Sequence, residues 1–277
     1  MDFKNSDVNK ALPRWIDDIR KMSRDPFVSD VIALFHEIDQ FYSTIPEEYE
    51  WRFIDSDNFN RQAITLTNPD QLNKYYWEDQ IQNIRAYLVI TCWRTAELYY
   101  SSRVELTNKS IVSSAVLARS LLELASFFIK NANIIAFTLE KLDFTDGKII
   151  VSSDLEKEIV RMIWGTRLGN PEDSLKIPNI LNTLDSLSKN PNAADLRNKY
   201  EYLCEVAHPN VVGNANYWTH IENIDPDLSE NRIMQQSAGG PTSRDICEHI
   251  LWCLSWSGLT VKGGYQVIMD AVNFLPY

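Results

Sequence analysis

The chain of 277 residues is poor in glycine, and its few cysteines are not spaced as pairs along the sequence. Nine glycines is a low count, which disfavours the glycine-rich loops of dinucleotide-binding proteins and the many turns of β-rich folds. The four cysteines form no Cys-x-x-Cys pair, and their neighbours are typical of apolar helix faces. Neither a zinc site nor a disulfide framework is indicated, and we predict no metal and no cofactor.

Basic runs are also missing, because Lys and Arg never occur more than two in a row. The net charge is −11 and the sequence pI is about 4.9. Proteins that grip nucleic acid usually carry a basic face. This composition disfavours a protein whose main task is binding nucleic acid, although an acidic protein can still act on RNA through a small local site. An acidic surface that keeps a cytosolic protein soluble is the simpler interpretation.

The sequence shows no targeting or membrane-spanning segment. Residues 1–5 lack the apolar stretch of a signal peptide. The longest apolar region, 111–129, is interrupted by Arg119 and Glu123, which is typical of a core helix. We therefore expect a cytoplasmic protein with no membrane partner.

A helical period of 3.6 residues dominates the chain and predicts an all-α fold. The apolar share of 44% and eight tryptophans indicate a well-filled core. Two long helices, over 77–106 and from 108 to about 142, are separated by so few residues that they must be antiparallel neighbours. The sequence therefore predicts a multi-helix bundle of long antiparallel helices.

Shorter elements complete this bundle. The Asp146-Gly147 turn predicts a small β-hairpin or loop insertion near 143–151. Residues 209–241 read as the longest irregular region, and Gly263-Gly264 as a site where the last helix kinks. Residues 1–72 are expected to form an N-terminal helical extension packed on a bundle of 73–277, in one continuous domain. Further helices are predicted over 9–22, 26–42, 153–164, 179–189, 192–208 and 242–275, whereas 51–66 is ambiguous.

The first candidate site residues are Arg119 and Glu123. They lie four apart, so they share one helix face and can pair with each other. Leucines and valines surround them in the sequence, which places the pair in or beside the core. A buried ion pair that fixes how two helices meet is the structural alternative to a functional site.

The second candidate set is Glu201, Glu205 and His208, which share one helical stripe. Pro209 stops the helix directly after His208, and the helix dipole there favours a protonated histidine. Such a residue can act as a general acid, or it can simply cap the last carbonyls of its own helix. Glu205 and His208 also have the Glu-x-x-His form of di-iron bundles, but the chain has no second copy.

The segment Ala118-Arg119-Ser120-Leu121-Leu122-Glu123, together with Tyr202-Leu203-Cys204-Glu205-Val206-Ala207-His208-Pro209, resembles a group of prokaryotic helical proteins. That group looks related to the HEPN-like helical bundles of toxins and abortive-infection proteins. The resemblance spans about 77–210. It implies a four- or five-helix bundle in which Arg119, Glu123 and His208 converge, with Glu205 beside them, to act on RNA in phage defence or stress response. A homodimer is implied as well, since HEPN-type sites are commonly built at a two-fold interface.

HEPN ribonucleases carry Arg-x4–6-His on one helix, and this motif is absent before His208. Arg244 and His249 satisfy it at the start of the last helix, and with Tyr202 they are the predicted binding residues. Two hypotheses follow. One is a metal-independent ribonuclease or RNA-binding protein. The other is a non-catalytic scaffold or protein-interaction module with a buried Arg/Glu/His network.

Overall fold

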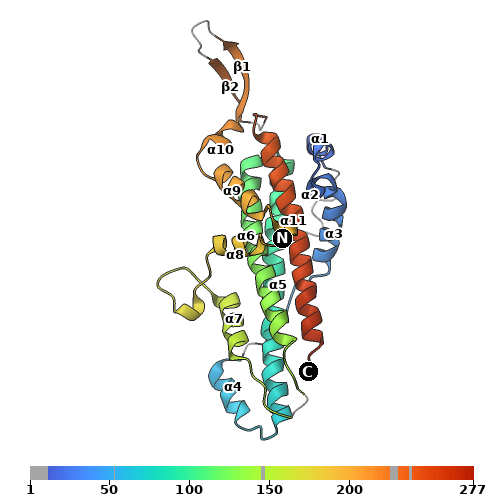
Figure 1. Ribbon diagram of the computed structural model, residues 1–277, viewed down its shortest axis with the longest axis vertical. Coiled ribbons are helices and arrows are strands. Elements are labelled where there is room, and N and C mark those ends of the chain that lie inside the picture. The colour runs from blue at the N-terminus through green and yellow to red at the C-terminus, as the bar shows by residue number, and fades with distance from the viewer. Residues whose placement is uncertain (1–11, 53, 145–146, 225–229, 237–238) are drawn as a thin grey trace. The chain divides into compact units, whose positions relative to one another are not determined.

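The computed structural model describes residues 12–277 apart from 53, 145–146, 225–229 and 237–238, with no side-chain description for 219–233. The predicted all-α bundle is confirmed (Figure 1). The helices and strands are α1 (Arg14–Met22), α2 (Pro26–Ser29), α3 (Val31–Ser43), α4 (Ser56–Ala63), α5 (Pro69–Thr107), α6 (Ile111–Leu139), α7 (Ser153–Trp164), α8 (Ile180–Leu187), α9 (Leu196–Ala207), α10 (Val211–Ala215), β1 (Trp218–Ile224), β2 (Glu230–Met234) and α11 (Ser243–Asn273).

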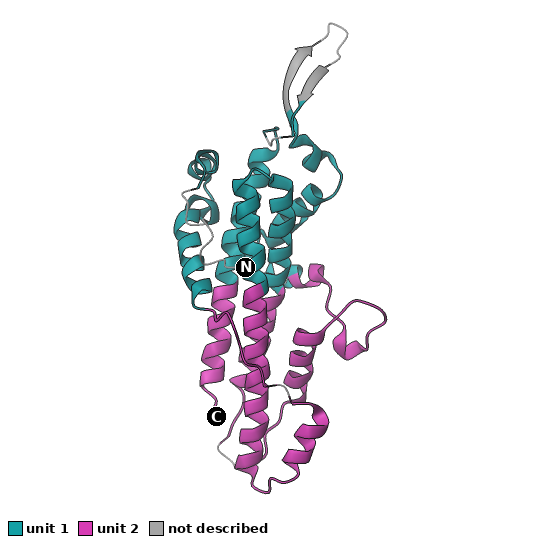
Figure 2. Cartoon of the chain, turned by 180° about the vertical axis from the view of Figure 1, so that it is seen from behind, with its two compact units in different colours: residues 1–44, 94–126, 184–260 teal, residues 45–93, 127–183, 261–277 magenta. Residues whose placement is uncertain are grey.

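The chain divides into two compact units (Figure 2). Unit 1 comprises 1–44, 94–126 and 184–260, and unit 2 comprises 45–93, 127–183 and 261–277. Each of the long helices α5, α6 and α11 contributes one part to each unit. The predicted boundary between 72 and 73 falls in the first turns of α5, and the division into extension and bundle stays a prediction.

Unit 1 is organised around a buried arginine on α5. Arg103 donates from Nη1 to Asp39 Oδ1 of α3 at 2.7 Å. Its guanidinium carbon lies 4.5 Å from the ring centre of Phe35 and 5.2 Å from that of Tyr99. Arginine tolerates such a place because its flat, weakly hydrated head stacks on aromatic rings while it pairs with a carboxylate. The arrangement fixes how α3 packs on α5.

The α5–α6 pair is antiparallel, as predicted. Ser102 and Ser114 face each other across it, and each hydroxyl donates to the other residue's carbonyl, at 3.0 and 2.8 Å. These small side chains let the two helices approach closely. Lys109 in the short connection has φ 62°, which places it in the left-handed region that ends many helices.

The start of α5 lies earlier than predicted. The dipeptide Asn68-Pro69 reads as a turn in the sequence, but it is the beginning of the helix. Asn68 Oδ1 accepts from the N–H of Asp70 at 2.9 Å, and Pro69 occupies the first helical position. Both residues are favoured at a helix start, where N–H groups lack a partner within the helix. Asparagine accepts a hydrogen bond from one of these groups, and proline has no N–H.

The segment 148–152 in unit 2 is an extended loop held by side chains of α5. Asn73 donates to Lys148 O and accepts from Ile150 N, both at 2.7 Å. Trp77 Nε1 donates to Ile150 O at 3.0 Å, and Tyr76 Oη bonds both backbone groups of Ser152 at 3.2 Å. The described residues of 143–151 therefore form the loop alternative of the prediction, because α5 satisfies the backbone groups that a second strand would have paired.

The β-structure occurs instead within 209–241, where the prediction of an irregular region is wrong. Strands β1 and β2 pair antiparallel, with Trp218 opposite Met234 and Ile224 opposite Glu230, and the register shifts twice along the ladder. The short helix α10 precedes them. The Asn- and Pro-rich composition hid these elements, because it matches turns better than regular structure.

Gly263-Gly264, the site predicted for a kink, does not interrupt α11, which continues to Asn273. Two glycines of α11, Gly258 and Gly264, instead let neighbouring side chains pack directly against the helix backbone. A Cβ on Gly264 would lie 2.8 Å from the Phe128 ring in unit 2, and one on Gly258 would lie 2.6 Å from Ile38 in unit 1. Larger residues at these positions would push α11 away from its neighbours.

The N-terminal elements are shorter than predicted. Residues 9–11 of the first predicted helix lie outside the described residues, and α1 begins at Arg14. The predicted helix over 26–42 is divided at Asp30 into α2 and α3. The ambiguous region 51–66 contains α4, whose start is capped by Asp55 Oδ1.

Among the described residues, one helix is long and apolar enough to cross a membrane by length and composition. It is α6, whose most apolar window has a mean hydropathy of 1.5 and is 50% buried inside the protein. Core helices that pack on several neighbours have the same composition.

We expect Asn73→Ala to lower the free energy of unfolding by about 2 kcal/mol, because two buried hydrogen bonds of roughly 1 kcal/mol each are lost. Denaturant unfolding of the purified variant measures the effect. Gln71→Ala, at an exposed position on the same helix, is the matched control and should change stability by less than about 0.5 kcal/mol. Equal effects of the two substitutions would contradict the anchoring role of Asn73.

Candidate functional site

Helix α9 of unit 1 carries most of the predicted site residues, and an apolar stripe fixes its orientation. Leu196, Tyr200, Leu203 and Val206 recur every three or four residues and are buried. The helix ends at His208, whose ψ of 153° is extended because Pro209 follows it. Side chains on either side of this stripe meet α6 and α11.

Arg119 and Glu123 pair on one face of α6, as predicted. Arg119 Nε lies 3.7 Å from Glu123 Oε1, and the two side chains are 26% and 32% exposed. The pair therefore lies beside the core. Tyr200 of α9 donates its hydroxyl to the same Glu123 oxygen at 3.0 Å. Burial, and then the charge of Glu123, raises the pKa of Tyr200, so the hydroxyl remains a donor.

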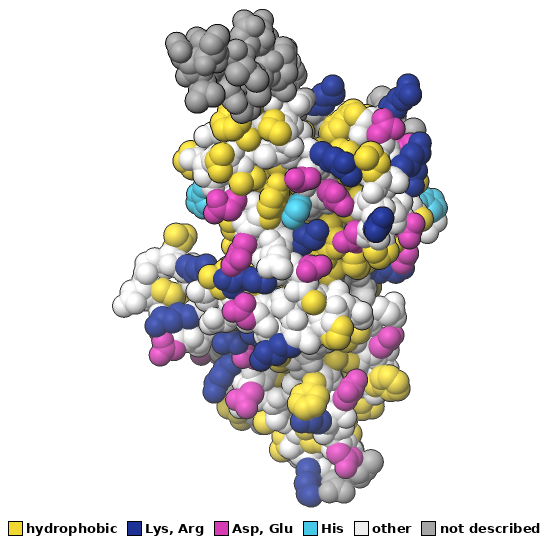
Figure 3. Space-filling model, turned by 45° about the horizontal axis from the view of Figure 1, so that its top comes forward, with side chains coloured by type: hydrophobic (Ala, Val, Ile, Leu, Met, Phe, Trp, Pro, Cys, Tyr) yellow, Lys and Arg dark blue, Asp and Glu magenta, His cyan; other side chains and the backbone are white. Residues whose placement is uncertain are grey.

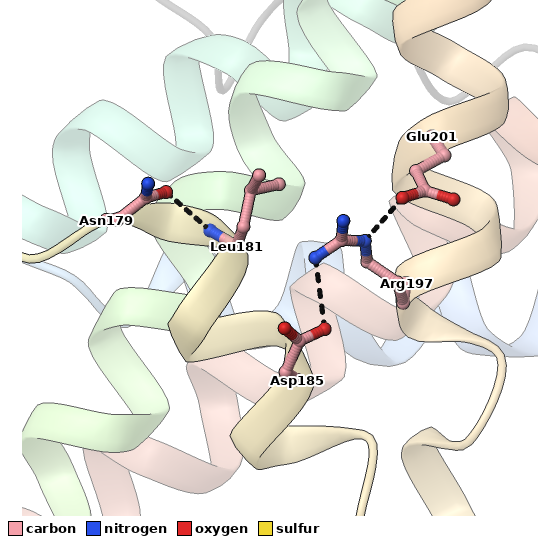
Figure 4. Close-up of polar contacts among 5 residues, drawn as sticks. All are labelled: Asn179, Leu181, Asp185, Arg197 and Glu201. Carbon is pink, nitrogen blue, oxygen red and sulfur yellow. Dashed lines mark hydrogen bonds and ion pairs between the residues drawn. The ribbon is translucent and has the colours of Figure 1, made fainter.

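Glu201 takes part in a different contact. Arg197 of α9 donates to Glu201 Oε1 at 2.6 Å and to Asp185 Oδ1 of α8 at 3.0 Å (Figure 4). In the same figure Asn179 Oδ1 accepts from the N–H of Leu181 at the start of α8. Glu201 thus pairs with Arg197, and among the described residues no contact joins it to His208.

Glu205 and His208 lie at the exposed end of α9. Asn210 donates its side-chain amide to Glu205 Oε2, and its N–H donates to the His208 carbonyl at 2.8 Å. His208 is eight residues from Tyr200, which is about 12 Å along a helix. Within the described residues, no contact joins His208 to Arg119 or Glu123. The convergence implied by the resemblance is thus not made within the chain.

Tyr202 and His249 form a third contact, between α9 and α11. Their rings stack with centres 3.9 Å apart and planes at 18°. His249 Nδ1 lies 2.8 Å from the carbonyl of Asp245, one turn earlier on α11. A carbonyl only accepts, so Nδ1 carries the proton and Nε2 keeps a lone pair. Arg244, the other half of the Arg-x4-His match, is exposed, and no contact between it and His249 is described.

Burial determines the charge state of this stack. Burial lowers the pKa of His249, and the nearby Lys199 ammonium lowers it further, so the imidazole is neutral at pH 7. Burial raises the pKa of Tyr202 to about 12. Two neutral rings can stack without a desolvated charge between them.

Several neighbours of these contacts escaped the sequence analysis. Lys199 lies over the Trp252 ring at 5.5 Å, and Phe27 of α2 packs edge-on against the same ring at 5.5 Å. Ser23 donates to Glu248 of α11 at 2.6 Å. Trp252 and Trp256, four apart in a helix, were the sequence signal that an aromatic cluster lies here, and both are buried.

In the part of the chain that the structure describes, no group of three or more His, Cys, Asp or Glu side chains is placed to hold a metal ion. Comparison with protein-family models, with curated proteins and with solved structures gives no match for this chain. The residues themselves therefore carry the functional argument.

We expect a double-mutant cycle of Tyr200→Phe and Glu123→Ala to show a coupling energy of about 1 kcal/mol, because the two side chains share one hydrogen bond. Unfolding free energies of the single and double variants give this value. The matched cycle uses Tyr202→Phe with Glu123→Ala and should be additive. Coupling in both cycles, or in neither, would contradict the assigned bond.

The lowered pKa of His249 makes stability depend on pH. The folded protein binds this proton more weakly than the unfolded chain does, so the stability from the neutral imidazole is present above pH 6.5 and is lost as the pH falls through the folded pKa. We expect the Tm of the wild type to fall more than that of His249→Phe between pH 7 and 5. The control is His36→Phe, at an exposed position on α3, which should follow the wild type.

Proposed function

We propose that this chain is a non-catalytic helical scaffold that presents its surface to a protein partner. The observation that carries the proposal is the distribution of the predicted site residues. Arg119 pairs with Glu123, which also accepts a hydrogen bond from Tyr200; His249 stacks on Tyr202, and His208 lies at an exposed helix end. The first two groups of residues connect neighbouring helices, and His208 belongs to neither. No described contact connects the three groups with one another.

A catalytic histidine would show different features. It would face a cleft, with the group that orients it and the group that stabilises the transition state within hydrogen-bond reach. His249 instead packs against an aromatic ring and bonds its own helix, which is the pattern of a structural histidine. His208 is exposed, and among the described residues no hydrogen bond or ion pair of its imidazole is present.

The surface supports partner binding. Several large apolar side chains are exposed, among them Phe137 at 60%, Trp164 at 41% and Phe274 at 85%. On the face drawn in Figure 3, basic, acidic and hydrophobic side chains are interspersed, and basic side chains form no continuous area. Mixed surfaces of this kind suit a protein partner better than a phosphate backbone. A second copy of the chain is the partner that the HEPN-like resemblance implies.

A metal-independent ribonuclease is the second candidate, and one observation favours it. The Nδ1–H of His249 is anchored, so Nε2 is a basic nitrogen held in one orientation, five residues after Arg244. A neutral imidazole of this kind can serve as a general base. A role in phage defence rests only on this ribonuclease candidate together with the HEPN-like resemblance.

Cleavage of labelled total RNA in EDTA separates the two candidates. We expect no cleavage by the wild type above a blank preparation, and no difference among His208→Ala, His249→Ala and the control His36→Ala, because no contact among the described residues joins either histidine to a second acid–base group of another helix. Cleavage that is lost in only the His208 or only the His249 variant would refute the scaffold proposal and identify the catalytic histidine. Light scattering of the same preparations reports whether the chain forms a homodimer.

A further inference from the structure

A chain of hydrogen bonds in unit 2 links α5 to the segment before α4. The indole Nε1 of Trp51 donates to Asn83 Oδ1 at 3.0 Å. Because indole only donates, this bond fixes the Asn83 amide, whose Nδ2 donates to Asp79 Oδ2 at 3.2 Å. Gln80 Nε2 donates to the same oxygen at 3.3 Å. One carboxylate oxygen of Asp79 thus receives both donors.

Two acceptors in this network have no donor. Asp79 Oδ1 and Gln80 Oε1 are both buried and without a hydrogen-bond partner, and Gln80 as a whole is only 4% exposed. The amide orientations are fixed by the bonds just described, so a flip does not supply a donor to both. Each of the two oxygens exposes less than 1 Å² to bulk solvent. The smallest group that converts one of these acceptors into a donor is a proton on Asp79.

The charged surroundings of Asp79 come from three elements. Glu156 in the first turn of α7 repels a second negative charge, whereas Arg52 before α4 attracts it. Tyr75 and Tyr76 of α5 are close enough to sense the charge of Asp79, and both remain neutral phenols. Burial, followed by the repulsion from Glu156, raises the pKa of Asp79 to about 6.

The start of α7 is attached to α5 next to this carboxyl. Tyr76 binds the backbone of Ser152, and Ser152 is the N-cap of α7, accepting from Leu155 N at 3.4 Å. Tyr76 precedes Asp79 by three residues, so the two lie on neighbouring turns of one helix face. A charge on Asp79 therefore acts on the attachment of α7.

We propose that Asp79 is a proton-operated latch between α5 and α7: the start of α7 is held on α5 when the Asp79 carboxyl is neutral and loosens when it ionises. The proposal concerns regulation and is independent of whether the protein is a scaffold or a nuclease.

The direction of this pH dependence follows from the coupling between proton binding at Asp79 and the docking of α7. The pKa of Asp79 is higher in the docked state than the ordinary 3.8 that an exposed aspartate would have, so docking is strongest below pH 3.8 and weakens as the pH rises through about 6. This difference limits the change in the docking equilibrium to roughly 100-fold. Asp79 is only half-buried, and solvent screens part of its interactions, so we expect about tenfold.

Hydrogen exchange of the α7 amides, corrected for the intrinsic pH dependence of each amide, tests the latch. Between pH 5 and 7.5 we expect the protection of α7 in the wild type to fall about tenfold. In Asp79→Asn it should stay constant, because the amide cannot ionise and its own N–H can occupy the place of the proton. Equal pH dependence in the two proteins, or none in the wild type, would overturn the proposal.

Two further variants keep the test decisive if Asp79→Asn does not fold. Glu156→Gln removes the repelling charge from an exposed position, and it should move the midpoint of the α7 transition to lower pH. Asp154→Asn removes an equal charge from the exposed first turn of the same helix and should leave the midpoint unchanged. A midpoint that Glu156→Gln does not move, or that both variants move equally, would overturn the role of Asp79. Carboxyl NMR gives an independent check, because an Asp79 that titrates near 4 would also refute it.

Discussion

The need to satisfy backbone polar groups in segments that are neither helix nor strand shapes much of this structure. Buried backbone groups without a partner are costly, and segments that lie outside the β1–β2 pair cannot use its ladder. Helix α5 meets this need in unit 2 with side chains. Asn73 and Trp77 bind the segment 148–152, and Trp93 Nε1 donates to Pro46 O at 2.8 Å. A single helix thereby determines the path of two connections.

In unit 1 the same helix performs a different task with a charged residue. Arg103 gathers Asp39 and aromatic rings of α3 and α5 around one guanidinium. The pairs Arg119–Glu123 and Arg197–Glu201 belong to the same type of interaction, since each receives a further partner from a neighbouring helix. Ionisable residues inside helical stripes are therefore used here mainly to join helices, which is why they resemble a site in the sequence.

Sequence periodicity predicted the helical class, the α5–α6 pair and the ion pair at Arg119 and Glu123, because those features depend on spacings within one helix. It could not predict Tyr200 as the partner of Glu123 or the stack of Tyr202 on His249, because these contacts join residues far apart in the chain. The loop near 148 illustrates the same limit. Its composition is typical of a short β-hairpin, but the backbone binds helix side chains, for which no local pattern exists.

The contacts of 148–152 also bear on how this chain can change in evolution. Connections on protein surfaces usually accept insertions and deletions at little cost. Here side chains of α5 bind the backbone of residues 148, 150 and 152, which is every second residue of the segment. One additional residue would turn the carbonyl that Trp77 binds to the opposite side. Length variation is therefore excluded from this connection, although its composition is that of an ordinary loop.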